Sequence, residues 1–197
     1  MWSYSKSGFD QTHVLTLSYT YSIPRLSRVA PNPAVRHAFD NWEISGITSF
    51  ASGVPNSIGL SLTDNADLVG GGDGVRANIT GDPRLSHGQR GFSSMFNPTV
   101  FARPARGDAG NIGNGIVRGP GINNWDVTLF KNIPLKSDIR MIQFRWEFCN
   151  LANHTQFNGM NTTATFNAAG QQTNASLGQA TGARAARVMQ ASLRFKF

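Results

Sequence analysis

The last stretch of the chain, residues 187–197, alternates between two kinds of side chain. Counting back from the end, every second position is apolar: Phe197, Phe195, Leu193, Ala191 and Met189. Side chains of a β-strand point alternately to its two faces, so these five share one face and mostly polar residues share the other. A transmembrane β-barrel strand has this pattern over about 9–11 residues, with an aromatic side chain at the membrane interface. An edge or core strand of a soluble β-domain is the alternative.

Four earlier segments show the same period of two. The predicted strands are residues 13–22, 42–52, 123–133, 139–151 and 187–197. In the first of them Leu15, Leu17, Tyr19 and Tyr21 alternate with smaller or polar residues. Aromatic girdles of membrane barrels face lipid near the interfaces. On that basis the predicted lipid-facing anchors are Tyr19, Tyr21, Trp42, Trp125, Trp146, Phe195 and Phe197.

Three charged residues fall on the opposite, polar face of the third and fourth predicted strands. They are Asp126, Arg145 and Glu147, and they come close together if the hairpin pairs in register. Two carboxylates near an arginine suit acid–base chemistry. Opposite charges also commonly line sheet faces, and we favour a set of lumen-facing ion pairs.

The connections between these strands differ in length in a regular way. A moderate link, with a single helical turn expected at residues 34–39, is followed by a very long loop at 53–122. A short turn at 134–138 is followed by a second long loop at 152–186. Barrels of outer membranes have long extracellular loops and short periplasmic turns. We therefore predict an all-β fold: an antiparallel up-and-down meander of about five long strands, forming an open portion of an outer-membrane β-barrel.

Composition excludes several other classes. No apolar run approaches the roughly 18 residues that a transmembrane helix requires. The net charge is +7, but the basic residues are dispersed, so no nucleic-acid partner is expected. The chain has 1 cysteine, Cys149, and 4 separated histidines, which predicts no disulfide, no metal site and no cofactor. No nucleophile–base pair is apparent, so we do not expect an enzyme.

Five segments also resemble one family in their order along the chain. Residues 41–55, with Trp42-Glu-Ile-Ser-Gly-Ile followed by Ser-Gly-Val-Pro, resemble a strand of TonB-dependent outer-membrane receptors. Segments 96–101, 118–132, 144–154 and 183–197 resemble the closing strands and terminus of the same receptors. The similarity is to the subgroup that carries an N-terminal carboxypeptidase-regulatory-like domain.

The resemblance implies a barrel of about 22 strands, occluded by a plug, that imports a scarce nutrient with energy passed on by TonB. The resemblance leaves three classes of nutrient open: a siderophore, a vitamin or an oligosaccharide. The implied partners are outer-membrane lipid, the TonB system through an N-terminal part not in this chain, and the barrel-assembly machinery. That machinery would read a terminal signal formed by Met189, Ala191, Leu193, Phe195 and Phe197.

This sequence lacks a signal peptide, a TonB box and the plug domain. Five strands are too few to close a barrel, since known barrels begin at about 8. We therefore expect a C-terminal fragment of a longer receptor or a truncated gene product. The alternative function is a secreted soluble β-domain that binds a glycan or a protein partner through its Gly/Asn-rich loops.

Overall fold

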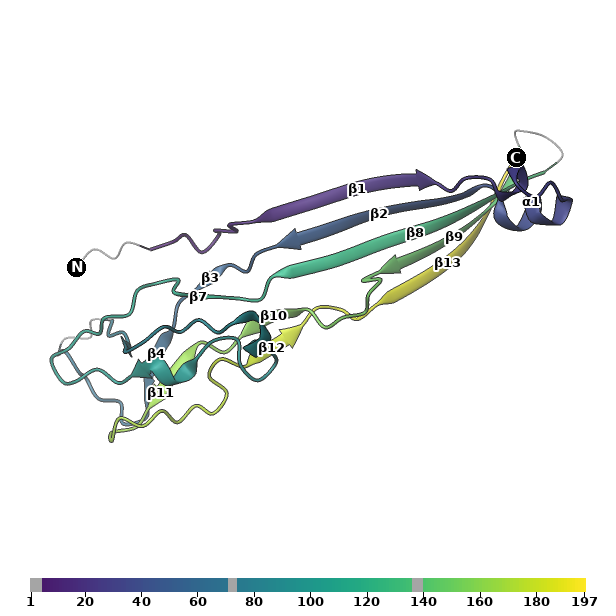
Figure 1. Cartoon of the computed structure of the whole chain (residues 1–197). Coiled ribbons are helices and arrows are strands. Elements are labelled where there is room, and N and C mark those ends of the chain that lie inside the picture. The colour runs from purple at the N-terminus through teal and green to yellow at the C-terminus, as the bar shows by residue number, and fades with distance from the viewer. Residues whose placement is uncertain (1–4, 71–73, 136–139) are drawn as a thin grey trace. The chain divides into compact units, whose positions relative to one another are not determined.

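A five-stranded antiparallel β-sheet is the main element of the computed structural model, which describes residues 5–70, 74–135 and 140–197. Its strands are β1 (Val14–Ser22), β2 (Trp42–Ala51), β8 (Ile122–Pro134), β9 (Met141–Cys149) and β13 (Val188–Lys196). They lie in the order β1-β2-β8-β9-β13, so each neighbours the next of the five in the chain (Figure 1). Within the described residues this sheet is an open up-and-down meander with β1 and β13 at its edges.

The strands have the length that a membrane requires. They contain 9, 10, 13, 9 and 9 residues, in chain order. A tilted transmembrane strand needs about 9–11. Each of the five can therefore cross the hydrocarbon layer of a bilayer.

Strand ends differ from the expected ones by small steps. β8 continues through Pro134, which is paired with Met141, so the predicted turn does not begin at Pro134. Residues 136–138 of that turn and the expected strand start at Ile139 lie outside the described part of the chain. β9 ends at Cys149 instead of 151, because Asn150 adopts a left-handed φ of 56°.

The link between β1 and β2 contains a short 3-10 helix, η1 (Leu26–Arg28), and an α-helix, α1 (Pro33–Phe39). The side chain of Asn32 caps α1 by accepting from the Ala34 amide at 2.8 Å. The helix thus starts one residue before the expected 34–39 turn. Among the described residues, no helix combines the length and apolar character needed to cross a membrane.

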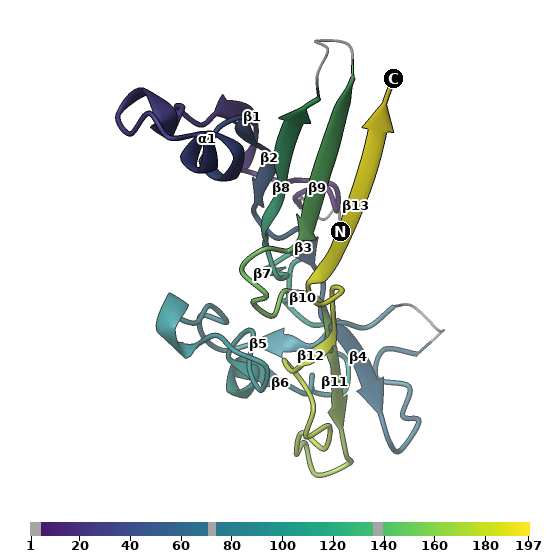
Figure 2. The ribbon, with the colours of Figure 1, turned by 90° about the vertical axis from the view of Figure 1, so that its right-hand side faces the viewer.

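The two long connections, predicted to be irregular, fold instead into a compact unit. This loop unit comprises Ala51–Gly121 and Gln156–Arg184, together with the segment that ends at His13. Short strand pairs organise it: β3 (Pro55–Asn56) with β7 (Val117–Arg118), β4 (Gly59–Leu62) with β11 (Thr163–Phe166), β5 (Asn78–Ile79) with β6 (Phe101–Ala102), and β10 (Phe157–Met160) with β12 (Ala180–Ala183) (Figure 2). It also contains the 3-10 helices η2 (His87–Gln89) and η3 (Pro98–Val100).

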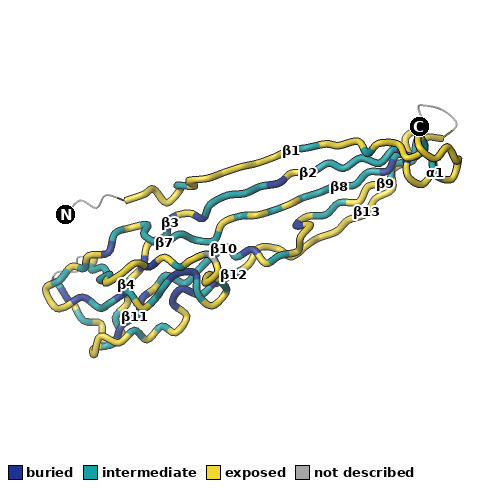
Figure 3. Tube along the Cα trace, viewed as in Figure 1, coloured by how far each residue is buried: buried dark blue, intermediate teal, exposed yellow. Residues whose placement is uncertain are grey.

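The loop unit has its own hydrophobic core, and the sheet does not. Among the described residues, every buried hydrophobic side chain lies in the loop unit, with Phe96 and Phe166 the largest. Figure 3 shows the edge strands β1 and β13 mostly in yellow, the colour of exposed residues. In the sheet, by contrast, Leu17 is 48% exposed and Leu193 is 72% exposed. Many apolar side chains of the sheet are therefore exposed and require an apolar solvent.

Candidate functional site: the two faces of the sheet and the loop unit

The pairing register gathers apolar residues of β8, β9 and β13 on one side, which we call the aromatic face. Leu129 lies opposite Trp146, and Trp146 lies opposite Ala191. Directly paired residues point to the same face of an antiparallel sheet. The other rows on this face are Val127 with Phe148 and Met189, Lys131 with Phe144 and Leu193, and Ile133 with Ile142 and Phe195.

Side-chain contacts extend the aromatic face to β1 and β2. The rings of Phe50 and Trp125 meet edge to face, with centroids 5.7 Å apart. The hydroxyl of Thr48 donates to the Tyr19 oxygen at 3.4 Å. Alternation along each strand then places Tyr19, Tyr21, Trp42, Trp125, Trp146 and Phe195 on this one face. Phe197 follows β13, and its ring stacks on that of Phe195 with centroids 5.7 Å apart.

The predicted terminal signal lies on the same face for its first four members. Met189, Ala191, Leu193 and Phe195 are paired with β9 residues of the aromatic face. All four are exposed, as is Phe197. This edge of the sheet thus presents an uninterrupted apolar row to its surroundings.

The opposite side, the polar face, carries the three predicted charges but does not join them all. Arg145 forms an ion pair with Glu147, and its guanidinium lies 5.3 Å from the centroid of the Phe130 ring. Asp126 instead accepts from the Asn150 amide at 2.9 Å and from the Asn124 side chain at 2.8 Å. The three charges are therefore one ion pair and a separate carboxylate that orders the end of β9.

Lys131 is the exception on the aromatic face, and it is not among the residues predicted above. Its Nζ donates to the carbonyl of Ala38 at 3.2 Å and to that of Asp40. It also lies 5.3 Å from the centroid of the Trp42 ring, within cation–π range. Counting by twos from Trp125 reaches Lys131, so a charge within the apolar period was the available signal.

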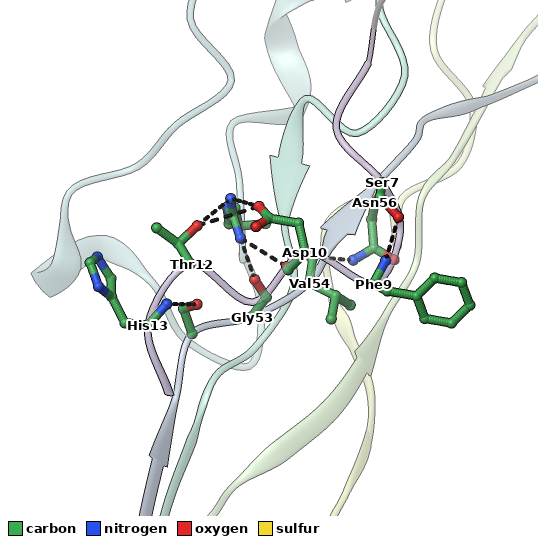
Figure 4. Close-up of polar contacts among 10 residues, drawn as sticks. Ser7, Phe9, Asp10, Thr12, His13, Gly53, Val54 and Asn56 are labelled. Carbon is green, nitrogen blue, oxygen red and sulfur yellow. Dashed lines mark hydrogen bonds and ion pairs between the residues drawn. The ribbon is translucent and has the colours of Figure 1, made fainter. Parts of the chain in front are cut away.

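In the loop unit, hydrogen bonds from Arg118 link residues 10–12 to Gly53. Figure 4 shows these partners, Asp10, Thr12 and Gly53, lying close together. The Arg118 guanidinium donates to the Asp10 carboxylate at 2.5 Å, to the Thr12 hydroxyl at 2.8 Å and to the Gly53 carbonyl at 2.9 Å. The hydrogen bond from Arg118 holds the pKa of Asp10 below its ordinary value of 3.8. A Cβ on Gly53 would lie 1.8 Å from the Gly119 oxygen, so only glycine fits at this crossing of the backbone.

A polar recess of about 400 Å³ is the candidate ligand-contact site of the loop unit. Arg103 lines it and forms an ion pair with Asp64 at 2.8 Å, while Arg106 contributes a second cation. The hydrogen bond from Arg103 lowers the pKa of Asp64. Within the described residues, no group of three or more metal-ligating side chains is arranged to hold an ion.

One comparison with known proteins identifies the family. The chain matches a family model described as "Outer membrane beta barrel domain" over residues 2–190. No curated protein and no solved structure matches it. The match covers nearly the whole chain, so the chain belongs to the outer membrane β-barrel domain family and is a protein of the outer membrane.

Proposed function

We propose that this outer-membrane β-barrel protein is a TonB-dependent receptor that imports a scarce nutrient, and that the chain supplies closing strands of its barrel. Supporting this are the five segments that resemble such receptors, in the same order, from residue 41 to residue 197. The resemblance includes Ser52-Gly-Val-Pro55, whose glycine is needed for the backbone crossing at Gly119.

The observation that carries the proposal is the difference between the two faces of the sheet. The strands expose apolar side chains on one face and hold the Arg145–Glu147 pair on the other. A membrane barrel with a hydrated interior requires this division, because its outward face contacts lipid and its inward face contacts water or a plug. In this assignment the aromatic face contacts lipid, and Asp126, Arg145 and Glu147 face the lumen.

The loop unit suits ligand capture. Its hydrophobic core holds the polar surface of the two long connections in a defined shape, and pre-organised surfaces bind without a large ordering cost. Both connections leave the sheet from the same end, after β2 and after β9. We assign that end to the extracellular side, where a siderophore, vitamin or oligosaccharide would first meet the receptor.

Two partners follow from this function. The barrel-assembly machinery would recognise the apolar row of β13 that ends near Phe197. The TonB system would act through a plug domain elsewhere in the full-length protein. The secreted soluble β-domain considered above is disfavoured, because the family is one of outer-membrane proteins.

Uptake in the source organism tests this function. Cells with the gene deleted, with the gene restored, and with wild-type levels are compared for uptake of labelled ferric siderophore, cobalamin and oligosaccharide. We expect deletion of the gene to abolish uptake of one of these three nutrients. In cells that carry the gene, collapse of the proton-motive force should abolish uptake of the same nutrient but leave its binding to the cell surface unchanged. Unchanged uptake of all three classes would leave an outer-membrane barrel without the proposed transport role.

A further inference from the structure

The link between β1 and β2 is exposed and combines basic with apolar side chains. Arg25, Arg28 and Arg36 are exposed on it. Leu26 is 46% exposed, Val29 83% and Phe39 54%. Segments of this composition lie at membrane interfaces, where apolar groups enter the acyl boundary and cations meet anionic headgroups.

The end of this link lies over the aromatic face. The carbonyl of Ala38, in α1, accepts from the Trp42 indole N–H at 2.9 Å and from Lys131 Nζ at 3.2 Å. Trp42 and Lys131 both belong to the aromatic face. Lys131 is also three residues from the end of β8, or roughly 10 Å along a strand, which places it near an interface.

A cavity of about 870 Å³ is lined by residues of the link and by residues at this end of the sheet. Three cations line it, Arg25, Arg36 and Lys131, against the two carboxylates of Asp40 and Glu43. His37 and Trp42 also line the cavity. Counted over these three cations and two carboxylates, the lining has a net charge of 3 − 2 = +1, which matches one phosphodiester.

The carboxylate of Asp40 is hydrogen-bonded to Ser27 and forms no direct ion pair with Lys131. It accepts from the Ser27 amide at 3.1 Å and from the Ser27 hydroxyl. Lys131 is only 6% exposed, and among the described residues no carboxylate lies within ion-pair distance of it. The direct partners of this buried ammonium are thus two carbonyls and a ring, and an anion in contact with it would offset the cost of its burial.

We propose that this cavity binds the phosphodiester headgroup of an anionic phospholipid. The lipid belongs to the leaflet at the end of the sheet where β1 connects to β2 and β8 connects to β9. Lys131 would approach the phosphate from the strand, with Arg25 and Arg36 approaching from the link. The exposed Leu26, Val29 and Phe39 favour a lipid over free phosphate, because they offer apolar contacts that acyl chains can use. The proposal requires the outer-membrane location and does not depend on transport.

Lipid titration of the purified full-length protein in detergent, followed by native mass spectrometry, tests this site. The first equivalents of phosphatidylglycerol are compared with those of phosphatidylcholine. The double variant Arg25→Gln/Arg36→Gln removes two lining cations, and Arg28→Gln is the matched control, since Arg28 is exposed on the same link but does not line the cavity. A cation near a membrane surface changes anionic-lipid affinity about fivefold.

We expect wild-type protein to prefer phosphatidylglycerol, the double variant to bind it at least about fivefold more weakly, and Arg28→Gln to change it less than about twofold. Millimolar inorganic phosphate should not displace the lipid. Equal affinity for the two lipids, or equal losses in the double variant and the control, would overturn the proposal. Displacement by phosphate would overturn the lipid as occupant.

A heat-modifiable band on electrophoresis shows that each variant has folded. If the double variant does not fold, the single variant Arg36→Gln carries the test, because Arg36 is an exposed residue of α1. A single-variant affinity equal to that of wild type would then contradict the site.

Discussion

Gly46, in the middle of β2, is the position where a single methyl group should harm the sheet most clearly. A Cβ added there would lie 2.6 Å from the Tyr19 oxygen, 2.7 Å from its Cζ and 2.8 Å from the backbone oxygen of Asp126. The Tyr19 ring covers the glycine from β1. The Asp126 carbonyl belongs to β8, so it cannot move without disturbing the neighbouring strand.

We expect Gly46→Ala to lower the free energy of unfolding by about 1–3 kcal/mol, the usual cost of forcing an extra methyl group into a packed site. Tyr19 can rotate away only by giving up the 3.4 Å hydrogen bond from Thr48 and exposing Gly46. Removal of the Tyr19 ring would relieve only part of the steric clash, because the contact with the Asp126 backbone oxygen remains. A Tyr19→Ala/Gly46→Ala double variant should therefore recover only part of the loss.

Urea unfolding from lipid vesicles, followed by tryptophan fluorescence, measures this cost. Gly59→Ala is the control, since a Cβ at Gly59 in β4 would have no heavy atom within 4 Å. The control should stay within about 0.5 kcal/mol of wild type, as surface substitutions do. If Gly46→Ala is as stable as Gly59→Ala, Tyr19 does not pack over Gly46. The described packing of β1, β2 and β8 around this glycine would then be wrong.

Three further predictions concern the lipid face, the Arg118 contacts and the loop core. Leu17→Arg should cost about 2–4 kcal/mol in urea unfolding from vesicles, whereas Ser18→Arg on the polar face should cost little; equal costs would contradict the facing. Arg118→Gln should speed amide exchange in residues 10–13, measured by mass spectrometry at neutral pH. Because the folded pKa of Asp10 is lowered below 3.8, its ion pair stabilises the loop unit at neutral pH, and this stabilisation is lost as pH falls through the lowered pKa. Wild-type exchange in acid should then approach that of Arg118→Gln, and a pH-independent difference would refute the ion pair. Phe96→Ala should cost the loop unit about 3–5 kcal/mol and admit protease between residues 81 and 122 while the heat-modifiable sheet persists; protection equal to wild type would contradict the separate core.

The strands of the sheet could be predicted from the sequence because the signal lies between neighbouring residues of one strand. Alternation with a period of two depends only on strand geometry, and it located five strands and the residues that share each face. Ends were less well defined, since they depend on single dihedral angles. At Asn150 a left-handed φ terminates β9, whereas Pro134 remains paired at the end of β8.

The loop unit could not be predicted in the same way. Its core joins residues far apart in the chain, such as Phe96 and Phe166, through strands of only two to four residues. Such short segments carry no period. Arg118 likewise meets Asp10 across 108 positions, a pairing that no spacing rule indicates.

Polar contacts on the sheet were only partly predictable. Arg145 and Glu147 pair as neighbours on one face of a strand, as their spacing suggested. The partner of Asp126 is instead a backbone amide beyond the end of β9. Lys131 is explained only by α1, whose carbonyl at Ala38 lies over the sheet after the chain folds.

Spin labels placed one at a time along β13, from residue 189 to residue 195 in a Cys149→Ser background, test the central claim most directly. In outer-membrane vesicles, accessibility to oxygen reports lipid, and accessibility to a water-soluble nickel complex reports water. The account predicts high oxygen accessibility at Met189, Ala191, Leu193 and Phe195, and high nickel accessibility at the residues between them. Loss of this alternation, or the opposite phase, would contradict a membrane-spanning sheet with its aromatic face toward lipid.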